Sequence, residues 1–233
     1  MKLAILETGA PPADIVDTYG TYPSMFRTLL GEDAHDYAVY DVAAGQYPEA
    51  VEAHRAYIIT GSSAGVYEPH GWIDPLKGFL LAAKGRAALV GVCFGHQIMA
   101  EAFGGKVIKS PKGWGVGLHR YQVARSHAWM DAAPSIGVPA SHQDQVVACP
   151  AGAQVVAASA FTPYGMLAYE DQAAISIQLH PEFTPDYARA LIESRRGTRY
   201  TDDQADAALA SYGEADDRAR VGSWISAFLA RTG

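Results

Sequence analysis

Residues 87 to 97 read Ala87-Ala88-Leu89-Val90-Gly91-Val92-Cys93-Phe94-Gly95-His96-Gln97. The apolar run over residues 89–92 is typical of a buried strand, and residues 94–103 have the pattern of a helix. Glycines stand two residues before and two residues after Cys93, which is the pattern of a nucleophile elbow with sulfur in place of a serine oxygen. Such a sharp turn leaves no room for side chains beside the turning residue and therefore requires these glycines. We expect the Cys93 thiol to be lifted out of the core at a helix N-terminus, where free amides and the helix dipole favour thiolate.

Strands and helices alternate along the rest of the first half. Strands are expected at residues 2–6, 37–42 and 56–60, and helices at residues 23–30 and 72–84. This alternation predicts an α/β fold with a mostly parallel central sheet and helices on both faces. The pattern leaves the order of the strands open.

The second half of the sequence has a different pattern. Residues 107–123 and 146–177 hold short β-rich runs separated by Gly, Pro and Asp, which predicts hairpins or meander strands that cover part of the sheet as a small antiparallel sheet. Residues 175–179 alternate like a strand that delivers His180-Pro181-Glu182 at its end.

The tail from Pro185 to Leu229 is expected to be helical, in three pieces broken near Gly197 and Gly213. Its charged residues, Arg195 and Arg196 among them, are expected to form a solvated face. Since no linker is long enough to separate two units, we expect a single domain over residues 1–233 with a C-terminal helical extension from about residue 185.

Composition argues against several classes of function. The chain is 49% hydrophobic and carries a formal net charge of −7, which is unlike the basic stripe of a nucleic-acid-binding surface. It has no run of about 18 apolar residues, so no membrane span is expected. The first seven residues reach an acid too soon for a signal peptide. Cys93 and Cys149 are the only cysteines and could pair, but so few cysteines in a chain of this size favour a reducing, cytoplasmic location.

A thiolate nucleophile benefits from a nearby base and from a third group that orients the base. His180 and Glu182 supply both, because residues two apart on an extended chain point the same way. An adjacent imidazolium would also keep Cys93 ionised near neutral pH. Acyl transfer further requires donors for the developing oxyanion. We expect these to be the amide of Phe94 and the glycine turn at Gly61.

These motifs together resemble one known family. Gly91-Val92-Cys93-Phe94-Gly95-His96-Gln97, His180-Pro181-Glu182 and Ile59-Thr60-Gly61-Ser62 closely resemble the class I glutamine amidotransferase domains. The segment Ser141-His142-Gln143-Asp144-Gln145-Val146 is similar to the Ser-His-Gly-Asp-x-Val segment of the GMP-synthase-like branch. The resemblance covers about residues 1 to 190.

The resemblance implies a three-layer, flavodoxin-like fold and a triad in which Cys93 is the nucleophile, His180 the acid/base and Glu182 its orienting partner. The substrate would be glutamine, cleaved to glutamate and ammonia through a γ-glutamyl thioester, with no metal or cofactor. The resemblance also implies substrate contacts for Gln97, and for the loop of Ser141, His142, Gln143 and Asp144.

Two departures from the family pattern leave alternatives open. Gln143 stands where the family usually carries glycine, and its side chain would reshape the substrate pocket. The chain also lacks both nucleotide-binding loops, Ser-Gly-Gly-x-Asp and Gly-x-x-x-x-Gly-Lys. Either a separate synthetase subunit receives the ammonia, or the protein is a free-standing hydrolase of γ-glutamyl peptides. A non-catalytic regulatory or binding subunit is a third hypothesis, which the intact triad opposes.

Overall fold

The structure is a computed structural model that describes residues 1–232. Its strands are β1 (Lys2–Glu7), β2 (Asp36–Asp41), β3 (Ala56–Ile59), β4 (Ala88–Val92), β5 (Lys106–Lys109), β6 (Gly115–Val123), β7 (Ser135–His142), β8 (Asp144–Ala148), β9 (Ala153–Ala158), β10 (Met166–Tyr169) and β11 (Ala174–Ile177). Its helices are α1 (Val16–Tyr19), α2 (Tyr22–Leu30), α3 (Ile73–Ala83), α4 (Phe94–Ala102), α5 (Pro185–Arg195), α6 (Asp202–Ser211) and α7 (Arg218–Arg231), and Val51–Ala53 form a 3₁₀ turn.

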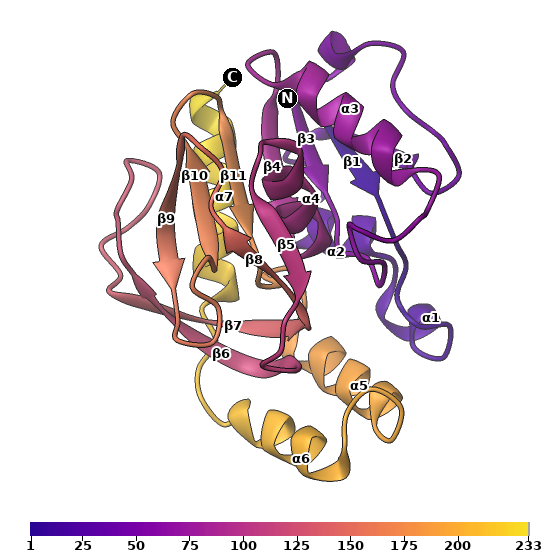
Figure 1. Cartoon of the computed structure of the whole chain (residues 1–233), viewed down its shortest axis with the longest axis vertical. Helices are drawn as coiled ribbons and strands as arrows, with labels where there is room; N and C mark the ends of the chain where they lie inside the picture. The colour runs from indigo at the N-terminus through magenta and orange to yellow at the C-terminus, as the bar shows by residue number, and fades with distance from the viewer. Residues whose placement is uncertain (233) are drawn as a thin grey trace.

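A nine-stranded sheet crosses the molecule in the order β2-β1-β3-β4-β11-β10-β9-β6-β7 (Figure 1). Strands β2, β1, β3, β4 and β11 pair in parallel. The three innermost of these, β3, β4 and β11, are buried along their whole length, as expected of parallel strands covered by helices on both faces. The predicted α/β fold with a parallel core is confirmed.

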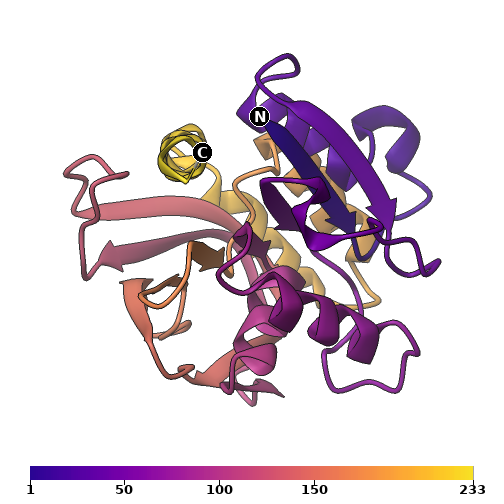
Figure 2. The same ribbon diagram turned by 90° about the horizontal axis from the view of Figure 1, so that it is seen from above.

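Alternate residues of β1 face two separate hydrophobic layers. Leu3 and Ile5 belong to the layer that contains α2 and α7, whereas Ala4 and Leu6 belong to the layer that contains α3 and α4. Figure 2 shows α7 on one side of the sheet and α3 and α4 on the other. The result is the three-layer arrangement that the sequence predicts.

The β-rich second half mostly extends the sheet instead of covering it. Strands β10, β9, β6 and β7 continue the parallel part as an antiparallel edge. Only β5 and β8 form a separate two-stranded antiparallel sheet. The expectation of a covering layer was therefore wrong for four of these strands, because their backbone groups find partners along the open edge beyond β11.

The tail folds into three helices, with breaks that include Gly197 and Gly213 as predicted. Trp224 of α7 is buried in the same layer as Leu3, so this helix completes the core. Helices α5 and α6 lie at the end of the molecule opposite the two termini (Figure 1). Within residues 1–232, no helix is long and apolar enough to cross a membrane.

Candidate active site

Cys93 occupies the turn between β4 and α4 in a strained conformation. It has φ +53° and ψ −103°, and no other non-glycine residue among residues 1–232 has a positive φ. A Cβ on Gly91 would lie 2.4 Å from the carbonyl oxygen of Gly95, and one on Gly95 would lie 2.2 Å from that of Ile59. The chain thus passes too close to itself for any side chain at either position, which is why the elbow requires glycine.

Two backbone hydrogen bonds fix the elbow to neighbouring strands. The N–H of Cys93 donates to the carbonyl of Ile177 at 2.8 Å, and the N–H of Gly95 donates to the carbonyl of Thr60 at 3.1 Å. Ile177 ends the strand that leads to His180, and Thr60 begins the turn that holds Gly61. The elbow, the histidine and the glycine turn are therefore held together by the sheet itself.

His180 and Glu182 form a buried pair. The Nδ1 of His180 lies 2.8 Å from Oε1 of Glu182, and their side chains are 4% and 0% exposed. Phe183 stacks on the imidazole with ring centroids 3.9 Å apart and planes inclined by 7°. The ring is thus fixed by the carboxylate at one nitrogen and by an aromatic face, and Nε2 is the nitrogen that Glu182 does not contact.

The electrostatics of the pair favour an imidazolium. Burial lowers the pKa of His180, but the negative charges of Cys93 and Glu182 raise it by more, to about 10. Oε2 of Glu182 is buried without a hydrogen-bond partner among the described residues, so the imidazolium is the partner that balances this carboxylate. This positive ring and the Cys93 side chain both lie beside Gly61.

Gly61 lies against both the thiol and the imidazole. A Cβ at Gly61 would be 3.1 Å from Cε1 of His180 and 3.7 Å from Cβ of Cys93. Across residues 1–232, neither the N–H of Gly61 nor that of Phe94 has a protein acceptor. Both amides are thus free to bind an oxyanion. Sequence reasoning missed Thr8, whose hydroxyl donates to the carbonyls of Thr60 at 3.0 Å and Gly61 at 3.2 Å and so fixes this turn.

A cavity of about 240 Å³ opens beside these groups, and most of the predicted site residues line it. Those at its wall are Gly61, Cys93, Gln97, Ser141, His142, Gln143, Asp144 and His180. Glu182 lies behind the imidazole, and the Phe94 side chain is fully buried, so that residue has only its amide to offer. The structure therefore brings the separate sequence motifs to one cavity.

Several polar groups at this wall already have protein partners. The side-chain amide of Gln97 donates to the carbonyl of Asp144 at 2.9 Å and to Oε1 of Gln178 at 3.1 Å. The buried ring of His142 contacts the Asp144 carbonyl at 3.1 Å, and burial together with the charge of His119 lowers its pKa to about 3. His142 is therefore neutral, and Gln97 and His142 hold the loop as well as facing the cavity.

The sequence did not predict the cationic and aromatic part of the cavity wall. Arg195 was expected on a solvated face, which was wrong: it lines the cavity, and its Nη1 donates to Oγ of Ser141 at 2.8 Å. Other unpredicted wall residues are Tyr22, Tyr67, Lys109, Trp114, Phe183 and Arg199. No motif marks these positions, because they come from helices, turns and strand ends that meet only in the folded chain.

Neither a metal cluster nor a disulfide is present within residues 1–232. No group of three or more His, Cys, Asp or Glu side chains there is arranged to hold a metal ion. Cys93 and Cys149 are both free, and Cys149 donates a weak bond from Sγ to the carbonyl of Ala153 at 3.6 Å. The thiol of Cys93 is thus available for chemistry.

Comparison with known proteins relates this chain to one family. The family model for class I glutamine amidotransferases matches residues 16–195. A glutamine amidotransferase-like protein of Schizosaccharomyces pombe is 30% identical over 223 residues, covering 89% of this chain and 90% of that protein. Gamma-glutamyl peptidase 4 of Arabidopsis thaliana is 30% identical over 185 residues, covering 76% of this chain and 73% of the peptidase.

Two further comparisons concern the fold and one larger enzyme. A glutamine-hydrolysing GMP synthase of Chromobacterium violaceum is 34% identical over 140 residues, covering 57% of this chain but only 26% of the synthase. The crystal structure of a glutamine amidotransferase from Thermotoga maritima superposes with a TM-score of 0.75 at 18% identity, covering 99% of this chain and 96% of the other, which shows the shared fold. On the match over residues 16–195, this chain belongs to the class I glutamine amidotransferase family.

Proposed function

We propose that this protein hydrolyses γ-glutamyl amide bonds by covalent thiol catalysis, with Cys93 as nucleophile, His180 as acid/base and Glu182 as the orienting carboxylate. The observation that carries the proposal is the strained Cys93 turn, which shares a cavity with an imidazole paired at 2.8 Å to a buried carboxylate. Strain of this kind persists only where the surrounding structure enforces it, and it is concentrated at functional sites.

In the first step the Cys93 thiolate attacks the γ-carbonyl carbon of the substrate. The carbonyl oxygen becomes an oxyanion, which the free amides of Gly61 and Phe94 stabilise. The C–N bond then breaks, and the protonated His180 gives its proton to the departing amine. The products of this step are a γ-glutamyl thioester on Cys93 and the free amine.

In the second step water hydrolyses the thioester. Neutral His180 takes a proton from the attacking water, whose oxygen bonds to the thioester carbon. The C–S bond breaks, glutamate leaves, and Cys93 returns to the thiolate beside an imidazolium. No electrons are transferred to or from the site, so the cycle requires no redox partner.

Two substrates fit this chemistry. Glutamine is the first, since it is the amide that the family hydrolyses, and its ammonia would pass to a separate synthetase subunit. A γ-glutamyl peptide is the second, and the side chain of Gln143 at the cavity wall and the relationship to a γ-glutamyl peptidase support it. A non-catalytic subunit is disfavoured, because it has no need of a strained cysteine beside an imidazolium.

The test is to incubate the purified protein with glutamine and with γ-glutamyl dipeptides and to measure the release of glutamate. Rapid acid quenching followed by mass spectrometry is expected to detect a γ-glutamyl adduct on the peptide that contains Cys93. Glutamate release without any such adduct would contradict the thioester mechanism. A wild-type protein that neither forms the adduct nor releases glutamate would favour the non-catalytic hypothesis.

Glu182→Gln is expected to move the alkaline limb of the kcat/KM profile to lower pH. In the wild type His180 keeps its proton until the pH rises through about 10, so a proton is available for the leaving amine below that pH. Glu182 is one of the two charges that raise this pKa, so a neutral amide lowers it and the proton is lost earlier. Glutamine at this position can still accept a bond from Nδ1, so an unchanged limb would contradict the electrostatic role.

A further inference from the structure

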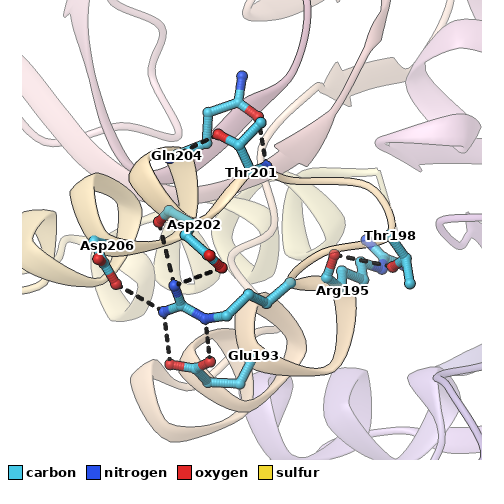
Figure 3. A network of polar contacts seen from close by, with 8 residues as sticks. Glu193, Arg195, Thr198, Thr201, Asp202, Gln204 and Asp206 are labelled. Carbon is cyan, nitrogen blue, oxygen red and sulfur yellow. Dashed lines mark hydrogen bonds and ion pairs between the residues drawn. The ribbon is translucent and has the colours of Figure 1, made fainter.

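The three arginines at the end of α5 and in the turn after it have different surroundings. Arg196 pairs with the carboxylates of Glu193 at 2.7 Å, Asp206 at 2.8 Å and Asp202 at 3.6 Å. Figure 3 shows these three acids around a single guanidinium group, where the end of α5 meets α6. Arg195 and Arg199, by contrast, line the cavity, and neither forms an ion pair within residues 1–232.

Arg195 and Arg199 are held at the cavity wall as a pair of like charges. Arg195 donates to Oγ of Ser141, and the Arg199 guanidinium lies 5.6 Å from the centroid of the Trp114 ring. Both residues line the same cavity, and burial together with the positive charge of Arg195 lowers the pKa of Arg199. Adjacent guanidinium groups without an acid are a ready site for an anion, and a carboxylate matches their planar donors best.

A chain of aromatic contacts connects this pair to the acid/base. Phe183 stacks on His180, and Tyr22 stacks on Phe183 with centroids 5.9 Å apart. Burial raises the pKa of Tyr22 to about 12, and the charge of Arg195 opposes that shift while those of Cys93 and Glu182 add to it. The backbone N–H of His180 also donates to the carbonyl of Pro139 at 2.9 Å, two residues before the Ser141 that Arg195 contacts, so Arg195 is on the His180 side of the cavity.

The anionic part of the wall is built from different segments. Tyr67 donates to the carboxylate of Asp144 at 3.0 Å, and Glu68 and Lys109 also line the cavity. None of these side chains contacts Arg195 or Arg199 by a hydrogen bond or ion pair in the described chain. The cavity thus has an acidic wall, suited to a substrate ammonium, and a separate basic wall near His180.

We infer that Arg195 and Arg199 form a carboxylate subsite for the leaving group, and that the preferred substrates are γ-glutamyl peptides whose leaving amino acid carries a free carboxylate. The inference rests on the proposed function and names its substrate class. His180 protonates the departing amine, so the leaving group departs on the side where the two arginines lie. The ammonia that glutamine releases has no carboxylate, so its leaving group gains nothing from this wall.

The test compares γ-glutamylglycine with γ-glutamylglycinamide, which differ only in the leaving group's carboxylate. In the wild type, kcat/KM for the free acid is expected to exceed kcat/KM for the amide by about tenfold or more. A factor of this size corresponds to one charge-assisted hydrogen bond. Arg199→Gln is expected to lower kcat/KM for the free acid by about tenfold and so to bring the acid-to-amide ratio close to one. Arg195→Gln is expected to act in the same direction, although it also removes the bond to Ser141.

Arg196→Gln is the matched control. It removes the same charge one residue from Arg195, but the Arg196 side chain pairs with three acids and does not line the cavity. Its acid-to-amide ratio is expected to stay within about twofold of the wild-type ratio. Thermal melting of all variants checks that they fold. A ratio in Arg199→Gln equal to that of the control would overturn the subsite.

A binding measurement separates this inference from the proposed function. Cys93→Ala protein is titrated calorimetrically with the same two compounds, with and without Arg199→Gln. If the wild type cleaves neither compound but the acid still binds more tightly through Arg199, the subsite stands and the hydrolase proposal fails. If cleavage depends on Cys93, but Arg199→Gln changes neither the acid-to-amide ratio of kcat/KM nor that of the binding affinities, the hydrolase proposal stands and the subsite fails. If neither cleavage nor selective binding is seen, both are wrong.

Discussion

Cys93→Ser is expected to lower kcat/KM for any γ-glutamyl amide by about a thousandfold or more. A serine hydroxyl has a pKa far above that of a thiol, so the imidazolium of His180 cannot hold it as an anion and the nucleophile is lost. The substitution changes one atom of a side chain that is 5% exposed, so the fold should survive. Steady-state kinetics of glutamate release from glutamine and from a γ-glutamyl dipeptide measure the effect.

Cys149→Ser provides the matched control for that experiment. This second thiol is outside the cavity and contacts only the carbonyl of Ala153 as a donor, so its replacement should leave kcat/KM within about twofold of wild type. If Cys93→Ser kept more than a tenth of the wild-type activity, Cys93 would not be the nucleophile. Equal losses in both variants would point to a general loss of folded protein.

Gly95→Ala is expected to destabilise the protein by about 3 kcal/mol or more. The new methyl group would lie 2.2 Å from the carbonyl oxygen of Ile59 and 2.9 Å from its carbonyl carbon. These are backbone atoms of a central strand, which cannot move aside as a flexible side chain can. For a chain of this size such a loss corresponds to a fall in Tm of roughly 6–12 °C, measurable by thermal unfolding followed by circular dichroism.

Gly78→Ala is the control for Gly95→Ala. Gly78 lies within α3, and a methyl group there would meet nothing within 4 Å. Alanine is the better helix former by about 1 kcal/mol, so this variant should be as stable as wild type or more so. A small, equal effect of the two substitutions would mean that the elbow can relax, contrary to the close approach described above.

The meeting of Cys93, His180 and Glu182 in the fold was predictable because each of the three lies in a short motif with a local physical cause. The strand before Cys93, the flanking glycines and the His180–Glu182 spacing all reflect backbone geometry that a sequence records directly. The parallel sheet then brings them together, because carboxyl ends of adjacent parallel strands meet at one edge. Local pattern and the α/β rules were enough for this half of the site.

The basic wall was not predictable for the opposite reason. Arg195 and Arg196 are neighbours of the same type, yet one lines the cavity and the other pairs with three acids. Which direction each side chain takes depends on where α6 packs, and no local pattern encodes that packing. The placement of β10, β9, β6 and β7 was predicted wrongly for a similar reason, since a short β-rich run does not indicate which strand it will pair with.

The proposed nucleophile and acid/base and the two arginines belong to different parts of the architecture. Cys93 and His180 follow strands that lie side by side in the middle of the sheet, whereas Arg195 and Arg199 come from the end of a peripheral helix and the turn after it. The proposed preference for a leaving-group carboxylate could therefore change through substitutions at Arg195 and Arg199, while the strands that carry Cys93 and His180 keep their places. A lineage built in this way can acquire new substrates by changing these two side chains, and a protein engineer can do the same.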